Sequence, residues 1–230
     1  MNNNYLLEIN KLCFSYAENQ VLQSISLTVR PGETLSLIGP SGYGKSTLLQ
    51  LIAGDLPPSS GSVTRKGLWR RVFQSDALLP WLSVEENIRM GLRGVDKARS
   101  LDFKTITEQL DIGRVLSLYP RQLSGGLRQR AEIARALIGR PDGLLLDEPF
   151  SSLDYLIRCE ARDYLSTLLK QVPLAMIFVT HDVPEAVSLT QKSYILKGHP
   201  ATIAGIYENS SMPSQELVEN IRRDLKRSEL

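Results

Sequence analysis

The sequence predicts an α/β fold around a parallel sheet, because two uninterrupted apolar runs each end in a polar cluster. Residues 143–146 and 174–179 are apolar, and polar residues follow at 147–149 and 180–182. Such runs are typical of strands buried on both faces. A helical stripe between them supplies the crossover, formed by Leu153, Ile157, Ala161, Leu165 and Leu168. Ligands bind beyond the carboxyl ends of such strands, so the polar clusters mark the expected site.

A third observation is a glycine-rich loop between a strand and a helix. Residues 35–38 read as a short apolar strand, and a helical segment that Gly54 closes follows the loop. The pattern G-x-x-x-x-G-K-[ST] is met by Gly39, Gly44, Lys45 and Ser46, and the expected phosphate loop consists of Gly39, Pro40, Ser41, Gly42, Tyr43, Gly44, Lys45, Ser46 and Thr47. Such a loop wraps its backbone N–H groups around phosphate oxygens. We expect Lys45 to reach the β- and γ-phosphates of a nucleotide and Ser46 to ligate Mg²⁺. An ordinary glycine turn is the alternative.

The other segments fit around this core. Residues 6–12 and 25–29 show strand periodicity, whereas 77–120 is mainly helical and more polar. We therefore expect one domain over residues 1–206 with a helical insertion at about 77–125. A polar C-terminal tail over 207–230 is expected to contain a helix.

Two neighbouring acids follow the strand at 143–146. Asp147 is placed to hold Mg²⁺ at the edge of the sheet. Glu148 is placed to act as the general base on the attacking water, because a base must not be neutralised by the metal. Two solvated acids at a strand end would be the alternative interpretation.

Bulk composition argues against some classes of protein. The formal net charge of +2 is too small to indicate a protein that binds nucleic acid through a strongly basic surface. The basic residues of one helical segment, Arg128, Arg130, Arg135 and Arg140, are interleaved with Glu132 and favour a solvated or interdomain face. No secretory signal and no run approaching ~18 apolar residues is present, so we expect a cytoplasmic chain. Cys13 and Cys159 are expected to be reduced packing residues.

A second set of motifs resembles the ABC ATPases. Residues 123–129, LSGGLRQ, resemble the LSGGQ signature, with Leu127 where Gln is commonest. The other matches are Gln74 to the Q-loop, residues 151–154 to the D-loop, His181 to the H-loop and Tyr16 to the aromatic that stacks on adenine. They occur in the family's order between about Leu6 and Ile203. Tyr43 departs from the family, which usually has a small residue there, and the interval between residues 47 and 74 is short.

The resemblance implies the fold and the cofactors. The fold is a P-loop NTPase (RecA-like) parallel-sheet core with an N-terminal antiparallel β subdomain and a helical insertion subdomain. ATP and Mg²⁺ are the implied ligands, with Ser46, Gln74 and Asp147 around the metal and with Gln74, Glu148 and His181 as catalytic residues. A core position for Tyr16 and a simple strand-end histidine at His181 are the alternatives.

The resemblance also implies a split site in a dimer. Ser124, Gly125, Gly126 and Asp154 would complete the nucleotide site of a second subunit, and a homodimer is sufficient because this chain carries every motif. A paired homologue is the other possibility.

Residues 73–84 resemble the nitrate, sulfonate, taurine and thiamine-precursor importer group. This implies a separate membrane permease, a solute-binding protein and a position on the inner face of the membrane. The apolar residues Leu78, Leu79, Trp81 and Leu82 would then belong to a groove that receives a permease helix, or else be ordinary core. A soluble ABC ATPase of DNA repair or translation and a small P-loop kinase are the alternatives to transport.

Overall fold

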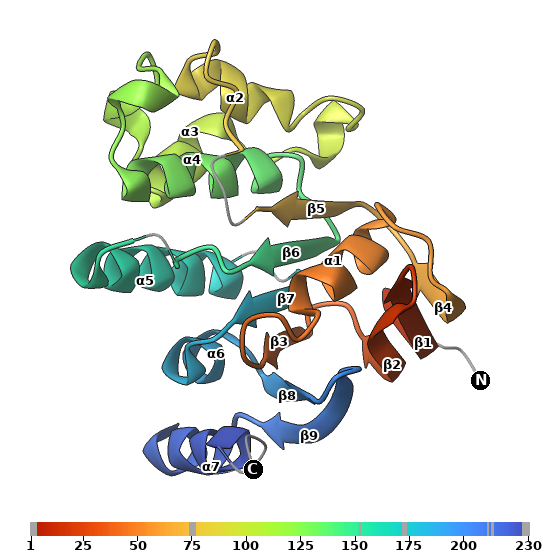
Figure 1. Cartoon of the computed structure of the whole chain (residues 1–230). Helices are drawn as coiled ribbons and strands as arrows, with labels where there is room; N and C mark the ends of the chain where they lie inside the picture. Colours follow the sequence, from red (N-terminus) through yellow and green to blue (C-terminus); the bar gives the residue numbers. More distant parts are fainter. Residues whose placement is uncertain are drawn as a thin grey trace. The chain divides into compact units, whose positions relative to one another are not determined.

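The computed structural model describes residues 4–73, 77–151, 153–171, 174–210, 212 and 214–226, in two compact units (Figure 1). Unit 1 comprises residues 1–67 and 174–230, and unit 2 comprises residues 68–173. Gln74 and Ser152, which belong to the expected Q-loop and D-loop, lie outside the described residues. No helix in the described ranges has both the length and the apolar character needed to cross a bilayer.

An antiparallel sheet begins unit 1. Its strands are β1 (Leu7–Tyr16), β2 (Asn19–Val29) and β4 (Ser60–Arg65), in the order β2-β1-β4. Leu7 pairs with Val29 of β2 and with Arg65 of β4. The expected antiparallel β subdomain is confirmed.

Unit 1 also contains the parallel strands that position the predicted site. They are β3 (Thr34–Ile38), β7 (Ala175–Thr180) and β8 (Lys192–Lys197), and β9 (Thr202–Glu208) adds an antiparallel edge. β3 runs parallel to both β7 and β8. Every residue of β3 and β7 is buried, which explains their uninterrupted apolar sequences. The predicted α/β class with buried parallel strands is therefore confirmed.

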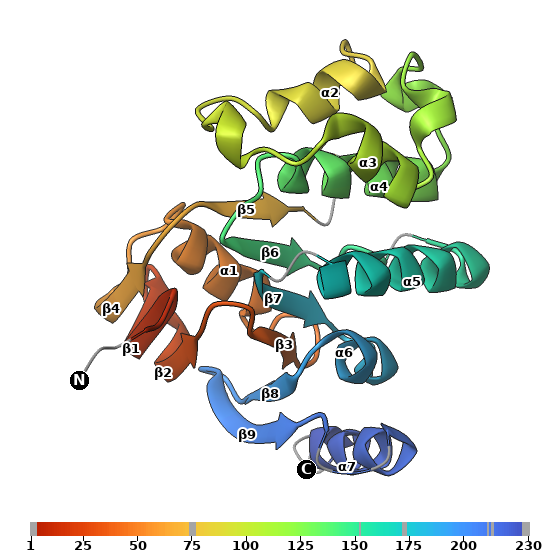
Figure 2. The same ribbon diagram turned by 180° about the vertical axis from the view of Figure 1, so that it is seen from behind.

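Three helices complete unit 1, namely α1 (Lys45–Ala53), α6 (Val183–Leu189) and α7 (Ser214–Lys226). Figure 2 shows α7 beside β9 near the C-terminus. Leu217 and Ile221 are the buried residues of α7. They share one apolar cluster with Ile38, the last residue of β3, and Val183, the first residue of α6. The C-terminal helix therefore packs against the elements that carry the phosphate loop and His181.

The described residues of unit 2 form two parallel strands and four α-helices. The strands are β5 (Trp69–Val72) and β6 (Gly143–Asp147). The helices are α2 (Val84–Met90), α3 (Phe103–Gln109), α4 (Gly125–Leu137) and α5 (Tyr155–Gln171), with 3-10 turns at Lys97–Arg99, Gly113–Val115 and Pro120–Gln122. The predicted stripe of α5 is seen in the buried residues Ala161, Leu165 and Leu168.

Two arginines of α4 differ from expectation. Arg130 is only 6% exposed, pairs with Glu160 at 3.0 Å and lies over the ring of Tyr164. Arg135 donates to the carbonyl oxygen of Ala77 at 2.7 Å. Of the expected solvated or interdomain face, the solvated form is wrong for these two residues, because acidic, aromatic and carbonyl groups of unit 2 cover their guanidinium groups.

Candidate nucleotide site

The phosphate loop has the backbone that its glycines predict. It connects the end of β3 at Ile38 to the start of α1 at Lys45. Gly42 and Gly44 have φ values of 84° and 74°, a region that other residues rarely adopt. A Cβ atom on Gly44 would also lie 2.8 Å from the side chain of Val21. Glycine is therefore required at Gly44 for both conformation and space.

Lys45 places its positive charge inside this loop. Its side chain is buried, and Nζ donates to the carbonyl oxygens of Gly39 and Pro40 at 2.8 Å each. The first turn of α1 contains no acidic residue, so its N-terminal dipole is uncompensated by side chains there. Ser46 is exposed at this helix start. The loop thus has the chemistry of an anion site.

Tyr16 lies at the surface of unit 1. It is 48% exposed, and its ring meets Phe14 edge-on at a centroid distance of 4.8 Å. Phe14, only 6% exposed, is the aromatic residue that enters the core. The alternative that Tyr16 is a core residue is therefore wrong, and its aromatic surface is available to a ligand.

Asp147 has a charged partner that the sequence did not indicate. Its carboxylate is buried and accepts a hydrogen bond from Arg71 at 2.9 Å. Asp147 ends β6 and Arg71 lies on the neighbouring strand β5. A buried carboxylate needs such compensation, and Arg71 supplies a positive charge beside Asp147 at the end of the strand.

Glu148 has a strained backbone. Its φ value of 44° lies in the left-handed region, where a residue with a side chain costs about 1–3 kcal/mol. The turn is held by Ser151, whose backbone N–H and hydroxyl group both donate to the carbonyl oxygen of Glu148. Five other residues with side chains have positive φ values in the described ranges, so this strain does not by itself assign a role to Glu148.

The signature segment begins α4 in unit 2. Ser124 is the N-cap and accepts a hydrogen bond from the backbone of Leu127 at 3.4 Å. A Cβ atom on Gly126 would lie 2.4 Å from the side chain of Ile157, so the helix start packs closely against α5. Ser124 and Asp154 are both exposed. The segment therefore presents a capped helix start and a carboxylate on the surface of unit 2.

His181 is exposed directly after β7. The residues beside it are fixed: Thr180 donates to the carboxylate of Glu185 at 2.9 Å, and Asp182 caps α6 by accepting from the backbone of Glu185 at 3.0 Å. The backbone at His181 is thus held on both sides while its imidazole faces outward.

The described ranges contain two of the residues expected to hold Mg²⁺, Ser46 and Asp147. In the described ranges, no group of three or more His, Cys, Asp or Glu side chains is arranged to hold a metal ion. A nucleotide-bound Mg²⁺ needs only one or two protein oxygens in addition to phosphate oxygens and water. The Ser46 hydroxyl and the Asp147 carboxylate are of this type, so the donor chemistry fits the ion.

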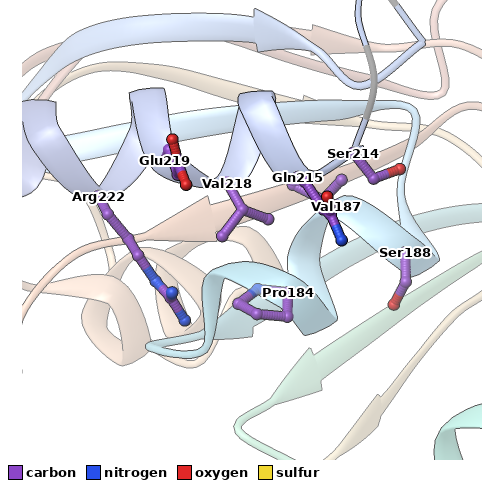
Figure 3. A pocket seen from close by; sticks show the side chains of 8 residues that line it. All are labelled: Pro184, Val187, Ser188, Ser214, Gln215, Val218, Glu219 and Arg222. Carbon is purple, nitrogen blue, oxygen red and sulfur yellow. The ribbon is translucent and has the colours of Figure 1, made fainter.

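A groove between α6 and α7 contains none of the predicted site residues (Figure 3). It has a volume of about 560 Å³ and is lined by Pro184, Val187, Ser188, Ser214, Gln215, Val218, Glu219 and Arg222. The candidate site therefore rests on the chemistry of the loops rather than on this groove.

Known proteins resemble the chain over most of its length. The family model described as "ABC transporter" matches residues 22–151. An aliphatic sulfonates import ATP-binding protein of Bacillus subtilis is 42% identical over 81% of this chain and 76% of that protein. A spermidine/putrescine import ATP-binding protein of Legionella pneumophila is 42% identical over 84% of this chain and 57% of that protein.

Solved structures have the same fold. The cbiO1 protein of Clostridium perfringens, part of the ABC transporter complex cbiONQ, matches with a TM-score of 0.79 over 98% of this chain and 97% of that chain, at 23% identity. The extent of the family match, the identity to the sulfonate relative and the phosphate loop agree. The chain belongs to the ATP-binding proteins of the ABC transporter family and is an ATPase.

Proposed function

We propose that this chain is the ATP-binding and ATP-hydrolysing subunit of an ABC importer. The observation that carries the proposal is the loop between β3 and α1, with Lys45 turned into it. Relatives at 42% identity that are named as import ATP-binding proteins support the direction of transport. Nothing in the comparisons favours the soluble alternative.

Different residues of the site are proposed to bind ATP and to catalyse its hydrolysis. The phosphate loop from Gly39 to Thr47 binds the phosphates, with Lys45 on the β- and γ-phosphates, and Tyr16 stacks on adenine. Glu148 accepts the proton of the attacking water, while Gln74 and His181 contact the γ-phosphate end. The held backbones at Glu148 and His181 support these assignments, because a catalytic group must be positioned before the substrate arrives.

Mg²⁺ is the proposed metal cofactor. Ser46, Asp147 and Gln74 are its proposed ligands. When bound, the ion neutralises charge on the phosphate oxygens. The position of Asp147 at the end of β6 supports the assignment, because carboxylate oxygens are preferred ligands of this hard cation.

The active form is proposed to be a head-to-tail homodimer. Ser124 caps α4 in unit 2, Gly125 and Gly126 begin this helix, and Asp154 is exposed in the same unit. These groups would complete the nucleotide site of a second copy. The ATPase domain is proposed to span residues 1–206, with the helical insertion at about 77–125 and the C-terminal tail at 207–230.

A separate membrane permease is the proposed partner at Trp81. Trp81 is 68% exposed, whereas Leu78 is 5% exposed and belongs to the core. The loop that carries Trp81 is anchored by the buried Asn87, whose side chain accepts from the backbone of Leu79 and donates to the carbonyl oxygens of Leu79, Leu82 and Ser83. An exposed aromatic on a rigid loop has the character of an interface anchor rather than of core.

The remaining parts of the transport system are proposed from the relatives. Sulfonates, nitrate, taurine or a thiamine precursor form the proposed substrate class, and the polyamine-importing relative leaves this class open. A solute-binding protein would deliver the substrate, and the subunit would lie on the cytoplasmic face of the membrane.

Two variants test the ATPase site. Lys45→Ala is expected to weaken ATP binding itself, because it removes the charge inside the phosphate loop. Glu148→Gln is expected to keep ATP binding but to lower hydrolysis about 10²–10⁴-fold, because it removes only the base. ATP binding and phosphate release are measured on purified protein free of contaminating ATPase. Hydrolysis at the parent rate by Glu148→Gln would refute its role as the base.

A mixing experiment tests the split site. Ser124→Arg should leave nucleotide binding to the isolated subunit nearly intact but abolish hydrolysis. Mixed with Lys45→Ala, it should regain activity in mixed dimers, because each such dimer contains one complete site. Complete failure to regain activity, in samples where mixed dimers form, argues against the head-to-tail arrangement.

Permease docking is tested with Trp81→Ala and a matched variant, Tyr119→Ala, which also truncates an exposed aromatic residue of unit 2. We expect Trp81→Ala to lower permease capture and transport while the basal ATPase of the free subunit stays near the parent value. Losing a buried anchor costs roughly 2 kcal/mol or more of binding. Equal effects of the two variants on permease capture would contradict docking at Trp81.

A further inference from the structure

The ring of a tyrosine in the phosphate loop contacts the ring of a histidine from a distant part of the sequence. The ring centroids of Tyr43 and His199 are 4.4 Å apart and the ring planes are tilted by 52°. Tyr43 is half-buried and His199 is exposed, and both belong to unit 1. Aromatic rings at this separation attract each other. The phosphate loop therefore has a side-chain contact outside its own strand and helix.

The turn that carries His199 is tied to β2. This turn connects β8 to β9. The backbone N–H of Ala201 donates to the carbonyl oxygen of Val21 at 2.8 Å, and the backbone N–H of Gln23 donates to the carbonyl oxygen of Ala201 at 2.9 Å. Two backbone hydrogen bonds thus fix the position of His199 relative to β2.

The ends of the phosphate loop lie close to the same elements. A Cβ atom on Gly44 would lie 2.8 Å from the side chains of Val21 and Leu22 in β2. A Cβ atom on Gly39 would lie 2.7 Å from the carbonyl oxygen of Leu196 in β8. A Cβ atom on Gly42, in contrast, would meet no atom within 4 Å. The ends of the loop are thus in close contact with the sheets, while the backbone next to Tyr43 stands clear.

We propose that His199 is a positioning residue for the phosphate loop. Its ring holds Tyr43, and Tyr43 holds the loop amides in the shape that receives the phosphates of ATP. The glycines on either side, Gly42 and Gly44, have positive φ values and can adopt many other conformations. A side-chain anchor between them lowers the entropy that the loop loses when ATP binds. This inference rests on the proposed role of the loop in phosphate binding.

The proposal is tested by a double-mutant cycle on the Kd for ATP, measured with Glu148→Gln as the background so that ATP is not consumed. His199→Ala is expected to weaken binding about two- to tenfold, the range of aromatic pair energies. Tyr43→Ser should have a similar effect, and the double variant should be no weaker than either single variant. Thr202→Ala, an exposed change next to the same turn, serves as the control and should bind like the background.

Conservative variants distinguish the ring contact between Tyr43 and His199 from a general loss of structure in the variant proteins. Tyr43→Phe and His199→Phe keep aromatic rings and should retain most of the affinity that His199→Ala loses. With Glu148 restored, His199→Ala should raise KM for ATP and leave kcat unchanged, because only the shape of the empty loop is affected. Any one of three results would overturn the proposal. These are an ATP affinity of His199→Ala equal to that of the background, additive losses of affinity in the double variant, or a His199→Phe variant that binds ATP as weakly as His199→Ala. Retained ATP binding in Lys45→Ala would instead contradict the phosphate loop itself.

Discussion

Truncation of Ile221 tests how α7 is attached to the rest of unit 1. Ile221 has no exposed surface and lies in the cluster that contains Ile38 and Val183. Replacing a fully buried isoleucine with alanine removes its transfer free energy and leaves a cavity, at a cost of about 2–5 kcal/mol. Domains have total stabilities of about 5–15 kcal/mol, so the change removes a large fraction.

The control is the same substitution at an exposed position. Ile206→Ala changes a residue of β9 that is 56% exposed, also in unit 1. Its expected cost is within about 1 kcal/mol, the span of β-propensities. For a chain of this size, 1 kcal/mol shifts Tm by about 2–4 °C, so Ile221→Ala should melt roughly 4–20 °C below the parent.

Thermal unfolding followed by circular dichroism is the assay, with ATP hydrolysis measured across the same temperatures. Ile221→Ala should lose hydrolysis at temperatures where Ile206→Ala is still active, because Ile38 precedes the phosphate loop and Val183 follows the His181 segment. Equal Tm values for the two variants would show that α7 does not pack on unit 1 as described.

Two further predictions concern α7 and the packing of unit 2. Burial and the hydrogen bond to Asp224 raise the pKa of Tyr207 from 10.0 to about 12. A raised pKa means that this stabilisation is complete below pH about 10 and is lost as pH rises through about 12, so Tyr207→Phe should flatten the alkaline loss of stability in urea unfolding. Gly91→Ala would place a Cβ atom 1.9 Å from the carbonyl oxygen of Arg135 and should destabilise the protein by about 1–3 kcal/mol or more. Gly113→Ala, where an added Cβ meets nothing within 4 Å, is its control.

A specific result would contradict each of the predictions for Tyr207→Phe and Gly91→Ala. An unchanged dependence of stability on pH in Tyr207→Phe would contradict the hydrogen bond between Tyr207 of β9 and Asp224 of α7. A Gly91→Ala protein as stable as Gly113→Ala would contradict the close approach of the end of α2 to α4.

Local sequence patterns predicted the strands and the phosphate loop because both are determined by near neighbours. The apolar run of β7 reads directly as a buried strand, since all of its residues are buried. The glycines at Gly42 and Gly44 predict positive φ values that the loop adopts.

Contacts between distant segments could not be predicted in this way. Arg71 and Asp147 meet because β5 and β6 are paired, and no spacing in a single sequence shows which strands are neighbours. Tyr43 and His199 likewise meet through a turn after β8. Arg130 looked solvated because its sequence neighbours are polar, yet the acid that covers it, Glu160, comes from another helix. Charge patterns along one helix therefore do not reveal which face tertiary contacts bury.

The start of α5 carries exposed apolar side chains that the proposed second copy would cover. Tyr155 and Leu156 are 76% and 75% exposed, and they directly follow the exposed Asp154. Large apolar side chains of this kind, next to a carboxylate and the capped helix at Ser124, are unusual on a surface that stays in water. The close packing of Gly126 on Ile157 couples the signature helix to this same segment. A second copy that covers Tyr155 and Leu156 would therefore contact the residues proposed to complete its own nucleotide site, which links dimer formation to ATP hydrolysis.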